Sequence, residues 1–182
     1  MNRRPTAYKA VALPLRHAGE ARPIVGRHDA RMSVDLEAVK TGLRAAVPFV
    51  RTLGLEFDEV SLDRAVLRMP DRADLHNHVG GPHAGAMFAL GESASGAIVI
   101  ASFADLLAQA TPLAKHAEID YLKIANGDVT AEATLSRTRE EVAADLAEGK
   151  TAKFDVAITL RDESGEATGQ MTVQWALRPN NR

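Results

Sequence analysis

The sequence predicts an α+β fold with an antiparallel sheet and one long central helix. The segment from about residue 82 to 104 is apolar and built largely of alanine, glycine and serine, over the length of a helix. Segments in which apolar and polar residues alternate, as in strands, come twice before it and four times after it. Helices and strands do not alternate along the chain, which argues against a doubly wound parallel fold.

The central segment carries two interior glycines, Gly91 and Gly96. Each interior glycine costs a helix about 1 kcal/mol relative to alanine. We therefore expect something to approach the helix axis closely, either a tightly curved sheet or a ligand. The helix is predicted over about 82–104, with Pro82 in its first turn.

Two predicted elements come before this helix. Ser33 is a good N-cap for a helix over about 34–46, which Pro48 and Gly54 close. Two strands within 55–69 are joined by a turn at Ser61–Asp63. After a break at Thr111–Pro112 we expect four strands, within 117–125, 128–137, 151–162 and 167–177, with a short helix or a broad loop over 138–149.

Composition limits the class of protein. The 182 residues are 46% hydrophobic and 25% charged, which suits a single globular domain. The absence of cysteine excludes disulfides, thiolate metal sites and a cysteine nucleophile. No uninterrupted apolar run approaches the roughly 20 residues that span a bilayer, so we expect no membrane segment.

Charge divides the chain into two parts. Residues 1–31 contain seven basic and two acidic residues, a net charge of +5, whereas the rest carries −7. An acidic domain is a poor partner for nucleic acid, because phosphate neutralisation supplies most non-specific affinity. The basic segment lacks the apolar stretch of a secretory signal. We expect residues 1–31 to be a disordered extension, residues 32–182 to form a single domain, and the location to be cytoplasmic.

Glu92 is the first candidate for chemistry. At 100° per residue, Gly85, Glu92 and Gly96 lie within about 40° of one another on the helix. A carboxylate flanked by glycine has open space beside it, and partial burial would raise its pKa. Glu92 is therefore a candidate base or nucleophile. The alternative is a buried glutamate that a strand residue or a subunit partner satisfies.

Polar groups just before the helix are the second candidates. The Asn77 amide could donate to a substrate carbonyl, as in an oxyanion hole, or Asn77 could be a turn residue with positive φ. The N–H groups of His83, Ala84 and Gly85 open the helix, where a developing negative charge is favoured.

A metal site is the alternative interpretation of the histidines in this segment. His76, His78 and His83 could act as ligands together with Glu92. Two of these histidines lie in a loop bracketed by glycine rather than on a rigid element, so we expect no metal site.

The segment resembles the PaaI-like acyl-CoA thioesterases of the hotdog superfamily. Those proteins carry an asparagine, six residues later a His-Gly-Gly, and nine residues after that histidine an acidic residue. Asn77, His83 and Glu92 keep both spacings, and the order of elements matches over about residues 50–178. The resemblance implies a hotdog fold, a long central helix wrapped by a curved antiparallel sheet of five to six strands.

The resemblance also implies an activity: hydrolysis of an acyl-CoA or related acyl thioester to a free acid and a thiol, with coenzyme A as part of the substrate and no metal or redox cofactor. Glu92 would attack the thioester carbonyl or activate water, the Ala84 N–H would polarise the carbonyl, and Asn77 would orient the thioester or the water. The family pairs two subunits, so that Glu92 faces Asn77 and Ala84 of the other subunit. A homodimer or a dimer of dimers is therefore implied.

Arg137, Arg139 and Lys150 are candidates for binding the phosphates of coenzyme A. Two residues depart from the family pattern: Ala84 replaces the first glycine of His-Gly-Gly, and Gly96 stands where many relatives carry serine or threonine. These departures favour an alternative, a weakly catalytic or non-catalytic hotdog dimer that binds acyl thioesters or another apolar ligand. A hotdog dehydratase that uses His83 with Glu92 is a third possibility.

Overall fold

The computed structural model describes residues 36–180. The expectation for residues 1–31 lies outside these residues. The helices and strands are α1 Leu36–Ala46, α2 Pro48–Leu53, β1 Glu56–Val60, β2 Ala65–Met69, α3 Ala84–Phe103, β3 Ala110–Tyr121, β4 Val129–Leu135, α4 Arg139–Ala147, β5 Ala152–Arg161 and β6 Ala167–Pro179, with short 3-10 helices η1 Ala73–Leu75 and η2 Ala104–Leu106.

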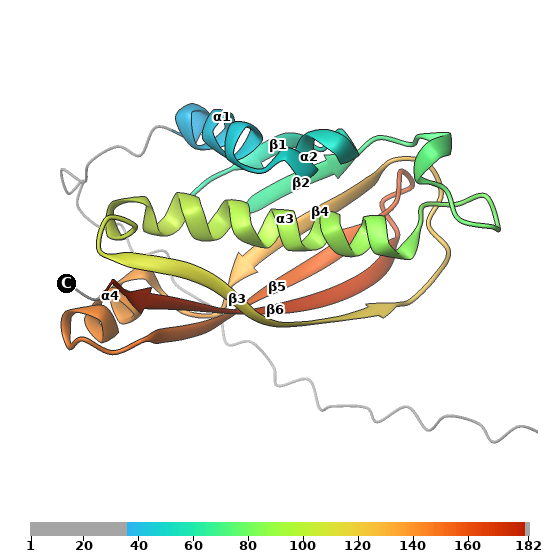
Figure 1. The fold of residues 1–182 in the computed structure, drawn as a ribbon. Helices are drawn as coiled ribbons and strands as arrows, with labels where there is room; N and C mark the ends of the chain where they lie inside the picture. Colours follow the sequence, from blue (N-terminus) through green and yellow to red (C-terminus); the bar gives the residue numbers. More distant parts are fainter. Residues whose placement is uncertain (1–35, 181–182) are drawn as a thin grey trace, which may run out of the picture. The chain divides into compact units, whose positions relative to one another are not determined.

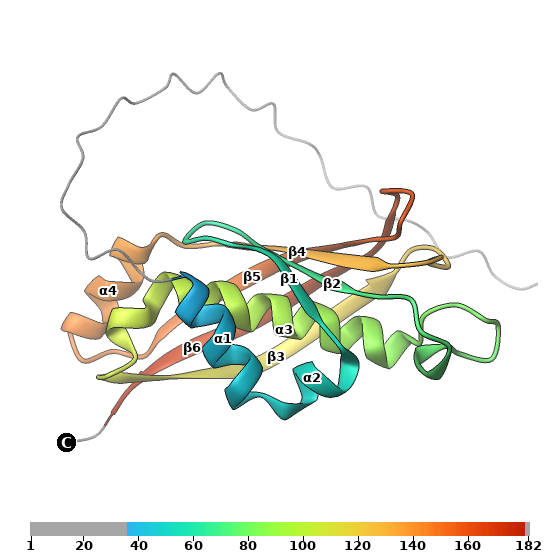
Figure 2. The same ribbon diagram turned by 90° about the horizontal axis from the view of Figure 1, so that it is seen from above.

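The strands form one six-stranded sheet in the order β1-β2-β4-β5-β6-β3, and every neighbouring pair is antiparallel. The helix α3 runs along one face of this sheet and contacts β2, β4 and β5 most (Figure 1). Seen from above, α1 crosses over α3 (Figure 2), and it packs against both α3 and β1. The predicted α+β architecture with a long central helix is confirmed.

The core lies between α3 and the sheet. Leu90, Ile98 and Phe103 of α3 are completely buried, and the Phe103 ring meets that of Phe154 on β5 with centroids 5.1 Å apart. The helical stretch 84–106 is long and apolar enough to cross a bilayer, but 72% of its apolar window is buried inside the domain. Burial on this scale is what a core helix requires.

The two interior glycines of α3 differ in their surroundings, since Gly91 is buried against the sheet and Gly96 is only partly buried. A Cβ at Gly91 would lie 2.6 Å from the Met171 sulfur on β6, whereas a Cβ at Gly96 would meet Trp175 at 3.9 Å, an ordinary contact. The predicted close approach to the helix axis is therefore made by the sheet at Gly91.

We expect Gly96→Ala to raise the free energy of unfolding by about 1 kcal/mol, because it gains helix propensity without a clash. Gly91→Ala should lose that gain, since Met171 must move within a packed core. Urea denaturation of the two variants measures the difference. A higher stability for Gly91→Ala than for Gly96→Ala would contradict this account.

The expected break at Thr111–Pro112 is wrong, because Pro112 lies inside β3. Within the described part of the chain β3 is an edge strand that pairs only with β6, so a residue without an N–H is tolerated on its open side. The first helix, predicted over about 34–46, ends at Ala46 before Pro48. Pro48 then starts α2, a second helix that was not predicted, at a position where proline is favoured. Gly54 does end this helical region, in the left-handed conformation with φ of 67°. The segment 138–149 contains α4, a helix with a capping box at Thr138 and Glu141.

Candidate active site

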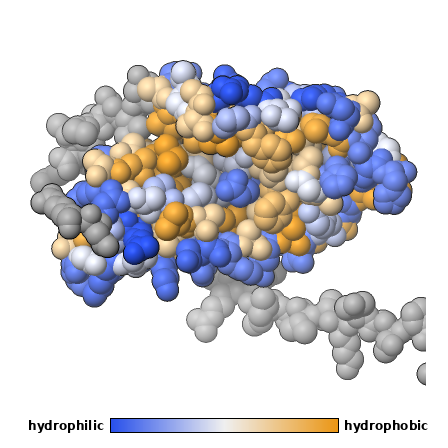
Figure 3. Space-filling view, viewed as in Figure 1, coloured by the Kyte–Doolittle hydropathy of each residue, from blue (hydrophilic) through white to orange (hydrophobic). Residues whose placement is uncertain are grey.

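Glu92 lies on a face of α3 that the sheet leaves open. Phe88, Glu92, Gly96 and Ile100 follow one another at four-residue spacing, and all four are only partly buried, whereas most of α3 is buried. In the view of Figure 1 this helix lies in front of β4 and β5, and on the same side of the molecule apolar residues reach the surface in patches (Figure 3). The open face is therefore largely apolar, with the Glu92 carboxylate and the neighbouring Ser93 as its polar residues.

The Glu92 carboxylate has no compensating group. Within residues 36–180 its side chain forms no hydrogen bond and no ion pair. Burial raises the pKa of Glu92 above the ordinary value of a glutamate, because the charged form is poorly solvated. A carboxylate of this kind is suited to accept a proton or to act as a nucleophile.

Ala84 offers the free backbone donor at the start of α3. The Gly85 N–H donates to Nδ1 of His83 at 2.9 Å, and the N–H groups of Ala86 and Met87 both donate to the His83 carbonyl, at 2.9 and 3.0 Å. The Ala84 N–H has no acceptor among residues 36–180. It therefore remains available, at the positive end of a 20-residue helix.

His83 serves as the N-cap of α3. Its Nδ1 accepts the Gly85 N–H, so the neutral ring carries its proton on Nε2. His83 and Glu92 are nine residues apart on one helix, about 13 Å along its axis. A His–carboxylate pair of the dehydratase type does not form within one chain.

The Asn77 side chain holds the loop before α3 through hydrogen bonds to its backbone. Its side-chain oxygen accepts the N–H groups of Val79 and Gly81, at 2.9 and 3.3 Å, and its amide donates to the Pro82 carbonyl at 3.2 Å. Asn77 does not have positive φ; Gly80 takes that conformation, with φ of 84°. The second amide hydrogen of Asn77 has no acceptor among residues 36–180 and can donate to a ligand.

A pocket of about 350 Å³ opens beside the start of α3. It brings together two of the predicted residues, Asn77 and Ala84. The other lining residues are largely apolar: Pro82, Met87, Tyr121, Leu122, Lys123, Ile124 and Ala125. The one cation among them, Lys123, forms an ion pair with Glu166.

Glu92 does not line this pocket. It lies eight residues after Ala84, about 12 Å farther along the helix axis. One chain therefore presents two separate parts of the predicted site, a donor pocket and a carboxylate on an open face.

The three histidines of this segment do not gather around one point. His76 contacts Asp71 through Nε2 at 2.6 Å, His78 is exposed, and His83 is the N-cap of α3. The described residues contain no group of three or more side chains that could hold a metal ion.

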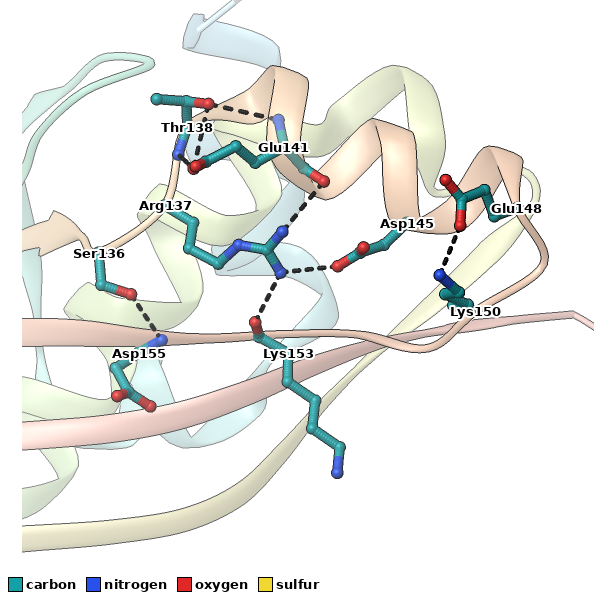
Figure 4. Close-up of polar contacts among 9 residues, drawn as sticks. All are labelled: Ser136, Arg137, Thr138, Glu141, Asp145, Glu148, Lys150, Lys153 and Asp155. Atoms are coloured by element: carbon teal, nitrogen blue, oxygen red, sulfur yellow. Dashed lines mark hydrogen bonds and ion pairs between the residues drawn. The ribbon is translucent and has the colours of Figure 1, made fainter.

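The three cations expected to bind coenzyme A lie around α4. Arg137 donates to the Asp145 carboxylate at 2.7 Å and to two backbone carbonyls, and Lys150 pairs with Glu148 at 2.5 Å (Figure 4). Arg139 binds Asp105 and the Ser102 carbonyl at the other end of α3. Ser102 is 18 residues from Ala84, about 27 Å along the helix. The structure does not bring these cations to the donor pocket of the same chain.

Sequence reasoning missed the contribution of β3 and the loop after it. Tyr121, Leu122 and Ile124 are 47%, 49% and 70% exposed, and all three line the pocket. The sequence does contain a signal for this part of the pocket: three apolar or aromatic residues fall within four positions, where the strand ends and a loop begins. The alternation that predicts a strand does not reveal that this one lies at the sheet edge.

The sequence matches a known protein family. The profile of the domain of unknown function DUF4442 matches residues 36–177. A search of the curated proteins found no match.

Several solved structures share the fold. The chain is similar to a protein of unknown function from Pseudomonas aeruginosa, PA5026, described as a probable thioesterase, with 28% identity, a TM-score of 0.73, and coverage of 83% of this chain and 100% of that one. A mutant of the P. aeruginosa thioesterase PA1618 gives 20% identity, a TM-score of 0.67 and coverage of 82% and 98%. The Escherichia coli PaaI protein of the phenylacetic acid degradation operon gives 15% identity, a TM-score of 0.62, and coverage of 78% of this chain and 92% of that one. The predicted hotdog fold is confirmed.

Proposed function

Since this chain belongs to the DUF4442 family and has a hotdog fold similar to that of thioesterases, we propose that it hydrolyses an acyl thioester, such as an acyl-CoA, to a free acid and a thiol. The observation that carries the proposal is a half-buried carboxylate on the same helix as an N-terminal N–H, both without a partner among residues 36–180. The first group can activate water, and the second can stabilise the negative charge that the reaction creates.

The two groups come together when a second copy of the chain completes the site. β3 is an edge strand whose side chains are mostly exposed, and the open face of α3 beside it is largely apolar. Pairing of two β3 strands would join the sheets of two copies and cover this face. In such a homodimer, or in a dimer of dimers, Glu92 of one subunit faces Asn77 and Ala84 of the other.

The reaction then follows from the chemistry of these groups. Glu92 takes a proton from water while the water oxygen bonds to the thioester carbon, and the carbonyl oxygen becomes an oxyanion that accepts the Ala84 N–H. The free amide hydrogen of Asn77 holds the thioester or the water in line. As the oxyanion collapses, the carbon–sulfur bond breaks, and the thiolate recovers the proton from Glu92. The products are an acid and a free thiol.

The decisive assay is hydrolysis of a panel of acyl-CoA thioesters, from short aliphatic to aromatic acyl groups, with detection of the free thiol. Turnover of one class above the uncatalysed rate supports the proposal and identifies the acyl preference. Absence of thiol release across the whole panel would contradict it.

Binding without hydrolysis is the second candidate function. The Ala84 methyl sits beside the proposed donor, and Gly96 supplies no hydroxyl one turn after Glu92. Native mass spectrometry that shows a retained acyl thioester, together with no thiol release, would favour this function over catalysis.

The activity should depend on pH through Glu92. The reactive form is the ionised carboxylate, and burial raises the pKa of Glu92. We therefore expect kcat/KM to fall as the pH drops, with a midpoint above the ordinary glutamate pKa of about 4.3. A pH–rate profile of the wild type measures this midpoint, and a midpoint at or below the ordinary value would contradict the assignment of Glu92 as the base.

A further inference from the structure

Tyr121 connects the end of β3 to the first turn of α3. Its hydroxyl donates to the Ala84 carbonyl at 2.8 Å, and its ring lines the donor pocket with Asn77 and Met87. Burial raises the pKa of Tyr121, so the phenol keeps its proton at neutral pH and remains a donor. No other side chain among residues 36–180 forms a hydrogen bond to this carbonyl.

The direction of the Ala84 N–H is set by the planar peptide that joins His83 to Ala84, and its position relative to the sheet depends on what holds the first turn of α3. The preceding peptide is held at its carbonyl, where His83 accepts the N–H groups of Ala86 and Met87. The following peptide is held at both ends, because Tyr121 binds its carbonyl and the His83 ring binds its N–H, which belongs to Gly85. In the α-helix the Ala84 carbonyl also accepts the Phe88 N–H, so the Tyr121 hydroxyl adds a contact that ties the first turn to the sheet.

We propose that Tyr121 is a positioning residue for the proposed thioester hydrolysis, on which this inference rests. By tying the Ala84 carbonyl to the end of β3, its hydroxyl fixes where the first turn of α3, and with it the free Ala84 N–H, lies relative to the bound thioester. The contact spans two different elements, the edge strand β3 and the helix α3. The position of the oxyanion donor is therefore set by the sheet and not by the helix alone.

The test is Tyr121→Phe, which keeps the ring in the pocket wall and removes only the hydroxyl. We expect kcat and kcat/KM for the best acyl-CoA of the panel to fall together by about tenfold, because the lost alignment matters mainly in the transition state. Ser102→Ala is the matched control. It removes a hydrogen bond from the other end of α3, to the Leu62 carbonyl at 2.5 Å, and should lower the melting temperature while leaving kcat unchanged.

A spectroscopic readout separates positioning from stability. Hexanoyl-CoA labelled with ¹³C at the carbonyl is bound to Glu92→Gln, with and without Tyr121→Phe. We expect the carbonyl stretching frequency to be lower, and the bond more polarised, when Tyr121 is present.

The results distinguish the inference from the proposed function. Wild-type kcat in folded Tyr121→Phe, or an unchanged carbonyl frequency in the double variant, would overturn the role of Tyr121 while leaving thioester hydrolysis intact. Equal losses of kcat in Tyr121→Phe and Ser102→Ala would show that the hydrogen bond from Tyr121 to the Ala84 carbonyl only stabilises the fold. If the wild type hydrolyses no acyl-CoA, the proposed function fails. The carbonyl frequency of bound hexanoyl-CoA still decides whether Tyr121 positions the Ala84 N–H.

Discussion

Glu92→Gln should lower kcat for thioester hydrolysis by about 10³-fold or more, because general base catalysis by a side chain contributes typically 10²–10⁴. Glutamine has nearly the same shape as glutamic acid but cannot accept the proton of the attacking water. The change takes a partner from no neighbouring group, since within residues 36–180 nothing forms a hydrogen bond or an ion pair with the Glu92 side chain. Steady-state kinetics with free-thiol detection measures the loss.

The same change on another helix is the control. Glu148→Gln alters an exposed carboxylate that pairs with Lys150 at the end of α4, and it should keep wild-type turnover. Stability gives a second check. Burial raises the folded-state pKa of Glu92, so ionisation of Glu92 destabilises the fold above that pKa and has no cost below the unfolded-state pKa. Glu92→Gln should therefore melt higher than wild type at neutral pH, and the difference should vanish in acid. Substantial turnover by a folded Glu92→Gln would remove this carboxylate from the mechanism.

The fold was predictable because its signals are local. The strand period of two residues identifies most of the sheet, and the low side-chain volume of the central segment indicates a helix against a closely approaching surface. Gly91 illustrates this, since the Met171 sulfur fills the space that a side chain would need. The missed helix α2 and the wrong break at Pro112 share one cause. Proline removes a hydrogen-bond donor, which is harmful within a helix or sheet but harmless at the first turn of α2 and on the open edge of β3.

The site was predictable only as far as it lies within one segment. Spacing along a helix places Glu92 on a definite face, and the helix start is evident from the sequence. Contacts between distant segments are not encoded in any local pattern. Tyr121 reaches Ala84 from a strand 37 residues away, and Arg137 is bound by α4, which folds back onto β5. A sequence shows that an arginine is present, but only the fold shows whether its hydrogen bonds are already used.

Ala84→Pro should lower kcat by about 10²–10³-fold, the usual cost of removing one oxyanion donor, without loss of the fold. Ala84 is the first residue of α3, where proline is favoured because its missing N–H has no helical acceptor. His83 has φ of −67° and ψ of 135°, an extended conformation that a following proline requires. The cap bond between the Gly85 N–H and the His83 ring does not involve the substituted nitrogen. Steady-state kinetics together with circular dichroism measures activity and folding separately.

Ala84→Gly tests the same atom from the opposite direction. It keeps the N–H and removes the methyl beside it, so turnover should be higher than in the wild type, whereas the added backbone freedom should lower the melting temperature slightly. The two variants therefore move activity and stability in opposite senses, because proline stiffens the first turn and removes the donor. Loss of activity that followed loss of stability in both variants would assign Ala84 a purely structural role. Wild-type turnover in a correctly folded Ala84→Pro would show that the thioester oxygen is stabilised elsewhere, and the pocket beside the start of α3 would then bind ligand without taking part in the chemistry.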